Sequence, residues 1–140
     1  LLSCSKASSV KRVVFTSSMS TVLPSQETIT SDVVVHETWF ADPASCEKSK
    51  HWYKLSKILA EEAAWKFAKV NGIDMVTVNP GWVIGPLQPT FNATVEPILK
   101  YVNRDERALD AVVPVWVDVR DTANAHVLAF EIHQLMEDIA

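Results

Sequence analysis

Short runs of apolar and β-branched residues along the chain predict three β-strands. They cover Val10–Phe15, Ile73–Val78 and Val115–Val119. The first run leads directly into the hydroxyl residues 16–18, which is typical of a buried parallel strand that delivers polar groups at its carboxyl end. Open α/β sheets bind their ligands at that end of the strands, so residues 16–18 are candidates for a functional site.

Apolar residues at three- and four-residue spacing predict a long helix over residues 51–71. The residues that carry this spacing are Trp52, Leu55, Leu59 and Ala63. Gly72 follows, where a helix commonly ends on glycine. Other helices are expected at residues 1–7, at 95–103 and from 120 or 121 onward. Residues 19–50 are expected to form a long, mostly irregular segment. A helix followed closely by an apolar strand is half of a parallel-sheet unit, which indicates an α/β fold.

Composition limits the chain to one domain and excludes several classes of function. With 140 residues, 48% of them hydrophobic, it can form one real core. Its 13 basic and 17 acidic residues are scattered and give a net charge of -4, which argues against nucleic-acid binding. Residues 75–95 carry no charge, but prolines interrupt them, so no membrane span is expected.

Cysteine and histidine usage points to neither a disulfide framework nor a metal site. Cys4 and Cys46 do not form a Cys-x-x-Cys pair, which favours a reducing, cytoplasmic setting. The four histidines lack metal-ligand spacing with carboxylates or cysteines, so no metal is expected and none of the four is expected to be catalytic.

Tyr53 and Lys57 lie four residues apart on the predicted long helix and therefore share one face. A neighbouring ammonium stabilises a phenolate, which lets a tyrosine exchange a proton with a carbonyl oxygen. Ser18 can hydrogen-bond the same oxygen and stabilise the charge that develops when hydride reaches the carbon. One of two adjacent serines at a strand end must point into the fold, so Ser17 is the alternative. The Tyr-x-x-x-Lys spacing alone also fits an amphipathic tyrosine beside a solvated lysine.

The order of these elements resembles the extended short-chain dehydrogenase/reductases, in particular plant dihydroflavonol reductases and cinnamoyl-CoA reductases. The segments that carry the resemblance are Lys11–Ser18, Trp52–Lys57, Leu59–Trp65, Asn79–Pro86 and Trp116–Asp121. The resemblance implies a partial Rossmann-like, doubly wound parallel sheet and NADP(H) as the cofactor. It also implies that Ser18, Tyr53 and Lys57 are the catalytic residues.

The same resemblance implies where cofactor and substrate bind. Tyr53 and Lys57 are expected to contact the cofactor, with Lys57 bonded to the nicotinamide ribose. Backbone that faces the nicotinamide carboxamide is expected at Pro80, Gly81 and Val83. The walls of a flat aromatic substrate pocket are expected at Met19, Trp82 and Phe91. For these last three residues ordinary core packing is the alternative interpretation.

One departure from the family pattern narrows the expected substrate. Cinnamoyl-CoA reductases typically read Asn-Trp-Tyr-Cys-Tyr-Gly-Lys at the helix start, whereas this chain has Lys-Leu-Ser at residues 54–56. We therefore expect an NADP(H)-dependent reductase of an aromatic or phenylpropanoid aldehyde or ketone rather than of a CoA thioester. The alternatives are an NAD-dependent nucleotide-sugar epimerase or dehydratase, which shares the three residues, and a catalytically silent fragment that acts by association.

The glycines lie in the wrong place for a cofactor-phosphate site. Gly72, Gly81 and Gly85 all follow the Tyr-x-x-x-Lys helix, whereas a dinucleotide fold needs glycines at its first strand-to-helix turn. We therefore expect residues 1–132 to be the later part of an NAD(P)-binding domain with the start of a substrate-binding region. This part lacks the N-terminal glycine-rich βαβ unit. Residues 133–140 are expected to be a divergent tail, and the sequence does not indicate an oligomeric state.

Overall fold

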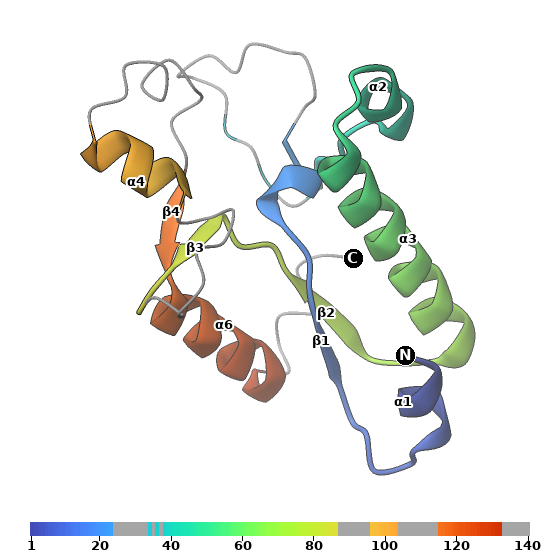
Figure 1. Cartoon of the computed structure of the whole chain (residues 1–140). Coiled ribbons are helices and arrows are strands. Elements are labelled where there is room, and N and C mark those ends of the chain that lie inside the picture. The colour runs from blue at the N-terminus through green and yellow to red at the C-terminus, as the bar shows by residue number, and fades with distance from the viewer. Residues whose placement is uncertain (24–33, 35, 37, 87–95, 104–114, 133–140) are drawn as a thin grey trace.

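Figure 1 shows a computed structural model of the chain, in which short strands lie between helices. The structure describes residues 1–23, 34, 36, 38–86, 96–103 and 115–132. Their elements are α1 Leu2–Lys6, β1 Val13–Thr16, the 3-10 helix η1 Met19–Thr21, α2 Pro43–Lys48, α3 Trp52–Asn71, β2 Met75–Val78, β3 Trp82–Ile84, α4 Glu96–Val102, β4 Trp116–Asp118 and α6 Val119–Glu131. Each predicted strand and helix is therefore confirmed, with shifted ends.

The strands of the described ranges form two parallel pairs. β1 pairs with β2, with Val13 opposite Met75, and β3 pairs with β4, with Trp82 opposite Trp116. Parallel neighbours need a crossover connection, and α3 lies within the connection between β1 and β2. The predicted α/β class is confirmed.

Helices cover both faces of β1 and β2. Figure 1 shows α3 on one side of this pair and α6 on the other, and α6 contacts both strands. α3 packs through Ala64 and Ala68, whose small side chains allow close contact with Met75 of β2. Helices on both faces of a parallel sheet are the doubly wound arrangement that was predicted from the family resemblance.

α3 ends where its sequence predicts. Gly72 has φ 62° and ψ 33°, a left-handed conformation that glycine adopts without steric cost. Its N–H donates to the carbonyl of Ala68, and so does the N–H of Ile73 at 3.0 Å. These bonds satisfy a carbonyl at the helix end that would otherwise lack a partner.

The face that α3 buries is not the one that its large apolar residues mark. Trp52, Leu59 and Ala63 are exposed, although their spacing predicted the helix. The buried residues are Ile58, Glu61, Ala64 and Ala68. A carboxylate therefore lies in the middle of the buried face, where it needs polar partners.

Arg12 joins three elements in the interior. Its Nε donates to Oδ2 of Asp74 at 2.8 Å, which links the start of β1 to the residue before β2. Its Nη1 donates to the carbonyls of Ala129 and Ile132 at 2.9 and 2.8 Å. A cation is favourable at a helix C-terminus, so Arg12 holds the end of α6 against the two strands.

Part of the expected irregular segment, residues 19–50, is helical. α2 begins after Asp42, whose carboxylate accepts hydrogen bonds from the N–H groups of Ala44 at 3.3 Å and Ser45 at 2.8 Å. Pro43 occupies the first turn, where its missing N–H costs nothing. This Asp-Pro pair is the start signal that the sequence interpretation overlooked. In the described ranges, no helix is both long and apolar enough to cross a membrane.

Candidate active site

The candidate site lies at the carboxyl end of the β1–β2 pair. The N–H of Ser17 donates to the carbonyl of Val78 at 2.9 Å, and the N–H of Met19 donates to the carbonyl of Pro80 at 2.9 Å. The two segments that follow β1 and β2 therefore leave the sheet side by side, and residues 17–19 face residues 78–80.

The two serines after β1 have different surroundings. Ser17 is only 4% exposed, and its hydroxyl donates a short hydrogen bond to Oε2 of Glu61. Ser18 is partly exposed, and its Oγ accepts from the N–H of Ser20 at 3.2 Å, with the Ser20 hydroxyl 3.0 Å away. A hydroxyl that accepts a hydrogen bond keeps its own proton to donate. Ser17 is thus the serine that points into the fold, and Ser18 is the one with a hydroxyl free to donate at the strand end.

α3 carries the predicted tyrosine and lysine to this end of β1. Nζ of Lys57 donates to the carbonyl of Thr16, the last residue of β1, at 3.1 Å. Tyr53 lies one turn earlier on the same face and is 66% exposed. The Lys54 side chain donates to the carbonyl of Leu23, and partial burial lowers the pKa of Lys54. The first turns of α3 are therefore held against the segment that contains Ser18.

A buried polar network behind these residues was missed by the sequence interpretation. Glu61 is 5% exposed and accepts from Nδ2 of Asn79 at 3.3 Å as well as from Ser17. The same Asn79 nitrogen is 3.0 Å from Oγ1 of Thr21 and 3.3 Å from the carbonyl of Ser18. Periodicity gave no signal for it, because the buried residues of α3, Ile58, Glu61, Ala64 and Ala68, lie on another face than the one its large apolar residues mark.

The expected nicotinamide-facing turn packs tightly against the start of β4. A Cβ on Gly81 would lie 2.3 Å from the carbonyl oxygen of Val115, so only glycine fits there. The N–H of Trp82 donates to the same oxygen at 2.8 Å. Pro80 uses its carbonyl to hold Met19, and Val83 continues into β3 opposite Val117. The residues expected to face the nicotinamide carboxamide, Pro80, Gly81 and Val83, therefore lie in one continuous, closely packed stretch of backbone.

The expected aromatic pocket residues are only partly brought together. Met19 lies in η1 beside Pro80, and Trp82 is 40% exposed at the start of β3. Trp82 packs edge-to-face on Trp116, with ring centroids 5.5 Å apart and an interplanar angle of 67°. Phe91 lies outside the described residues. Trp116 was not among the residues expected at the pocket, and its register opposite Trp82 emerges only from the strand pairing.

A histidine of α6 contacts the last residue of β1. Nε2 of His126 lies 2.7 Å from Oγ1 of Thr16, and its Nδ1 lies 2.7 Å from the carbonyl of Thr122. Since a carbonyl only accepts, Nδ1 carries a hydrogen, and Nε2 of the neutral ring accepts from the Thr16 hydroxyl. His126 therefore supports the residue whose carbonyl binds Lys57.

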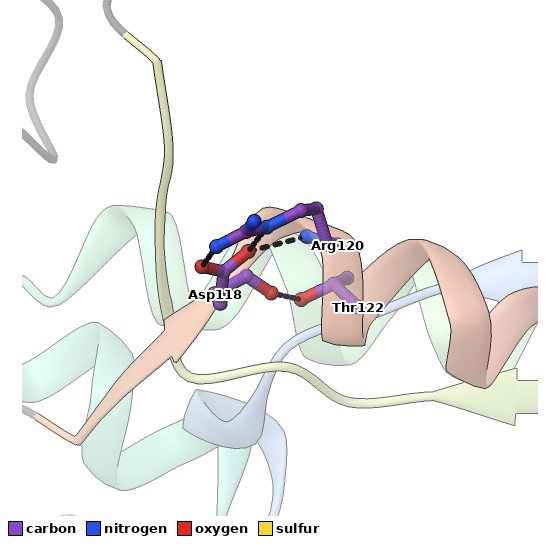
Figure 2. Close-up of polar contacts among 3 residues, drawn as sticks. All are labelled: Asp118, Arg120 and Thr122. Atoms are coloured by element: carbon purple, nitrogen blue, oxygen red, sulfur yellow. Dashed lines mark hydrogen bonds and ion pairs between the residues drawn. The ribbon is translucent and has the colours of Figure 1, made fainter.

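The start of α6 has a local, exposed set of polar contacts, which Figure 2 shows. The Asp118 carboxylate accepts from the N–H of Arg120 at 2.7 Å and from its guanidinium at 3.0 and 2.8 Å. The Thr122 hydroxyl donates to the Asp118 carbonyl at 3.2 Å. The guanidinium and the N–H of Arg120 hold the pKa of Asp118 at about 2, below its ordinary value of 3.8. These contacts join only Asp118, Arg120 and Thr122 to one another, at the start of α6.

The NAD dependent epimerase/dehydratase family matches residues 1–138. The chain belongs to this family. Cinnamoyl-CoA reductase CAD2 of Medicago truncatula is 54% identical over 132 residues, which are 94% of this chain and 40% of that protein. Tetraketide alpha-pyrone reductase 1 of Arabidopsis thaliana is 38% identical over 133 residues, with the same coverage of 94% and 40%.

Solved structures of this family share the fold. Vestitone reductase from alfalfa (Medicago sativa) matches with a TM-score of 0.73 at 26% identity, over 94% of this chain and 43% of that one. Gre2 from Candida albicans, solved as a complex with NADPH, matches with a TM-score of 0.63 at 26% identity, over 89% and 40%. The predicted resemblance to extended short-chain reductases is confirmed. The chain spans about two fifths of the length of the curated relatives described above.

Proposed function

We propose that the natural gene product containing these residues is an NADP(H)-dependent reductase of aromatic or phenylpropanoid aldehydes or ketones. The observation that carries this proposal is the contact of Lys57 with the Thr16 carbonyl, two residues before Ser18 and one turn from Tyr53. The reductase names of relatives at 38% and 54% identity support a reductase, and the name of the relative at 54%, a cinnamoyl-CoA reductase, supports a phenylpropanoid-type substrate. We further propose a cytosolic setting, which the lack of a Cys-x-x-Cys pair in the sequence supports.

Three side chains have the chemistry that carbonyl reduction needs. The Tyr53 hydroxyl gives its proton to the substrate carbonyl oxygen, and the Lys57 ammonium stabilises the phenolate that remains. The Ser18 hydroxyl donates a hydrogen bond to the same oxygen and stabilises its developing negative charge. NADPH, when bound, supplies the hydride that reaches the carbonyl carbon.

The residues present fit the nicotinamide end of the cofactor. Tyr53 and Lys57 offer a hydroxyl and an ammonium for the ribose at the carboxyl end of β1. The glycines do not fit the pyrophosphate end, because each has another structural role. Gly72 ends α3, Gly81 packs on Val115, and Gly85 packs on Val119. We therefore propose that residues 1–132 contribute the nicotinamide and catalytic part of the binding domain.

The segment after Tyr53 favours a free aromatic aldehyde or ketone over a CoA thioester as the substrate. Lys54, Leu55 and Ser56 replace the Cys-Tyr-Gly that is typical of cinnamoyl-CoA reductases. The Lys54 ammonium donates a hydrogen bond to the carbonyl of Leu23, which attaches the segment after η1 to α3. A cysteine at position 54 cannot make this bond. This attachment supports a pocket of different shape beside Tyr53.

Steady-state oxidation of NADPH by the natural gene product tests the proposal, with a free cinnamyl aldehyde and the matching CoA thioester as substrates. Tyr53→Phe should lower kcat on the aldehyde about 100- to 10,000-fold, because the general acid is lost. Ser18→Ala should lower it about 100-fold through loss of the oxyanion donor. The aldehyde should give the higher kcat/KM of the two substrates.

Glu62→Gln is the matched control, because Glu62 is exposed on the same helix and lies outside residues 54–56, on which the expected substrate preference rests. It should leave kcat unchanged. A Tyr53→Phe enzyme with wild-type kcat would reject the catalytic assignment, and higher turnover on the thioester would reject the substrate preference. Failure of the wild type to oxidise NADPH with any carbonyl would favour the epimerase or the silent-subunit alternative.

A further inference from the structure

We infer that Glu61 is a positioning residue of the reducing site, which sets the place of Ser18 relative to the helix that carries Tyr53 and Lys57. The inference rests on the proposed function and adds a residue to it. Glu61 touches no reacting group in the proposed mechanism. It acts through Ser17, which precedes Ser18 in the sequence, and through Asn79, which contacts the Ser18 carbonyl.

The burial of Glu61 is the first argument. A carboxylate that is only 5% exposed has lost most of its water, and it remains in place only if protein groups hydrogen-bond it. Its Oε2 accepts from the Ser17 hydroxyl and from Nδ2 of Asn79. Ser17 follows β1 and Asn79 follows β2, so this single oxygen ties α3 to both strand ends.

The second argument follows the network from Glu61 to Ser18. Nδ2 of Asn79 lies 3.3 Å from the Ser18 carbonyl oxygen, and the Thr21 hydroxyl donates to the same oxygen at 2.9 Å. Thr21 is 1% exposed and itself lies 3.0 Å from Asn79. The Ser18 carbonyl is therefore held by Asn79, which bonds Glu61, and by Thr21, which is linked to Glu61 through Asn79.

The third argument is the register between α3 and the end of β1. Lys57 donates to the carbonyl of Thr16, and Glu61, one turn later on the helix, accepts from the hydroxyl of Ser17. Two successive turns of α3 thus bind Thr16, the last residue of β1, and Ser17, the residue after it, through groups of opposite charge. Ser18 is the next residue, so its position relative to the helix has little freedom.

Precise placement matters because a displacement of about 1 Å in a reacting group can cost about 100-fold in rate. A buried glutamate that only stabilised the fold would change the amount of folded enzyme and leave the turnover of each folded site unchanged. The two roles therefore differ in kcat per cofactor-binding site, with active sites counted by NADPH fluorescence titration.

The experiment compares Glu61→Leu, Glu61→Gln and Glu62→Leu in the natural gene product. Glu61→Leu keeps the volume and removes the acceptor, whereas Glu61→Gln keeps an acceptor oxygen. Glu62 is the exposed neighbour on the same helix and serves as the matched control. We expect Glu61→Leu to lower kcat per site about 10- to 100-fold with the NADPH Kd changed less than about threefold. Glu61→Gln should recover most of that loss, and Glu62→Leu should behave as wild type.

A second measurement uses Ser17→Ala, which removes one of the two hydrogen-bond donors to Glu61 and leaves the carboxylate and its bond from Asn79 in place. Because both residues act through one hydrogen bond, the Ser17→Ala/Glu61→Leu double variant should lose no more kcat than the more affected single variant. Ser17→Ala alone remains informative if Glu61→Leu fails to fold. Additive losses would contradict coupling through that bond.

Two results would overturn the inference. One is a Glu61→Leu enzyme whose kcat per site lies within about twofold of wild type, and the other is a Ser17→Ala enzyme with unchanged kcat. Tyr53→Phe in the same assay separates this failure from failure of the proposed function. If Tyr53→Phe is inactive and Glu61→Leu is normal, only the positioning role is wrong. If Tyr53→Phe retains full activity, the catalytic assignment itself is wrong.

Discussion

The two strand pairs of this protein hold their polar residues in opposite ways. In the β1–β2 region, which comprises β1, β2, η1 and α3, polar side chains are buried and bond residues far apart in sequence, such as Ser17 and Glu61, 44 positions apart. In the β3–β4 region, which comprises β3, β4 and α6, the Asp118–Arg120 pair joins residues two apart, and the Arg120 side chain is 83% exposed. The candidate active site belongs to the β1–β2 region.

The difference shows what each kind of contact can do. A buried polar network costs free energy unless every member is paired, so it accepts only one arrangement of its elements. An exposed ion pair contributes little stability, because water and salt screen it. The β3–β4 region instead obtains close contact from glycines, with Gly81 against Val115 and Gly85 against Val119. Precise placement of reactive side chains is therefore expected of the β1–β2 region.

The largest stability effect should come from Arg12, which connects the two regions through β1, Asp74 and the end of α6. Oδ1 of Asp74 is buried and has no hydrogen-bond partner in the described part of the chain, so the carboxylate depends on Arg12. Arg12→Ala should lower the free energy of unfolding by about 3–5 kcal/mol, as expected when one member of a buried pair is removed. Urea denaturation followed by circular dichroism measures it.

Lys11→Ala is the control for this measurement, because Lys11 is the exposed neighbour of Arg12 in the segment that precedes β1. Its effect should stay within about 0.5 kcal/mol. If Arg12→Ala and Lys11→Ala gave equal midpoints and slopes, the two regions would not be joined through Arg12.

A smaller effect is expected from filling the glycine contacts of the β3–β4 region. Gly81→Ala would bring a Cβ within 2.3 Å of the Val115 carbonyl oxygen, and Gly85→Ala would bring one within 2.4 Å of Cγ1 of Val119. Each should lower the free energy of unfolding by about 1–3 kcal/mol, because the strands must move apart. Only the Gly85 clash involves a side chain. Val119→Ala should therefore relieve Gly85→Ala and leave Gly81→Ala unchanged in thermal melts.

If Val119→Ala restored the stability of both variants, the β3–β4 region would rearrange as a whole around each added methyl group. The contrast between backbone and side-chain contacts would then be wrong.

The smallest effect should come from Asp118. Hydrogen bonds from Arg120 lower the pKa of the folded-state carboxyl to about 2 from 3.8, so its contribution to stability is present above about pH 4 and is lost as the pH falls through about 2. Asp118→Asn should therefore differ from wild type in melting temperature at pH 7 and converge with it near pH 2. Added salt should shrink the difference at pH 7.

Asp121→Asn is the comparison variant, since Asp121 lies in the same first turn of α6 without being its N-cap. The pH dependence that Asp118 contributes should remain in this variant. A gap between Asp118→Asn and wild type that widens below pH 3 would contradict the assigned hydrogen bonds.

Local spacing predicted much of this molecule. The length of α3, its end at Gly72 and the shared face of Tyr53 and Lys57 depend on 3.6-residue periodicity and on glycine's backbone freedom. The strand limits were less well predicted. β1 begins at Val13 rather than Val10, because pairing starts where its N–H meets the carbonyl of Asp74 at 2.8 Å.

β3 was missed for the same reason. Its three residues, Trp82–Ile84, carry no periodic signal of their own, and they form a strand only because β4 lies beside them. A strand of this length is defined by its partner, which comes from a distant part of the chain.

The sequence by itself determined that one of two adjacent serines faces inward and that Tyr53 and Lys57 share a face, because both follow from backbone geometry between near neighbours. Only the tertiary structure decided that Ser17 is the inward one, since the choice depends on Glu61, 44 residues away. It also decided that α3 buries Glu61 and leaves Leu59 exposed. The free energy of burial depends on which groups a side chain meets, and those groups come from segments that local periodicity does not connect.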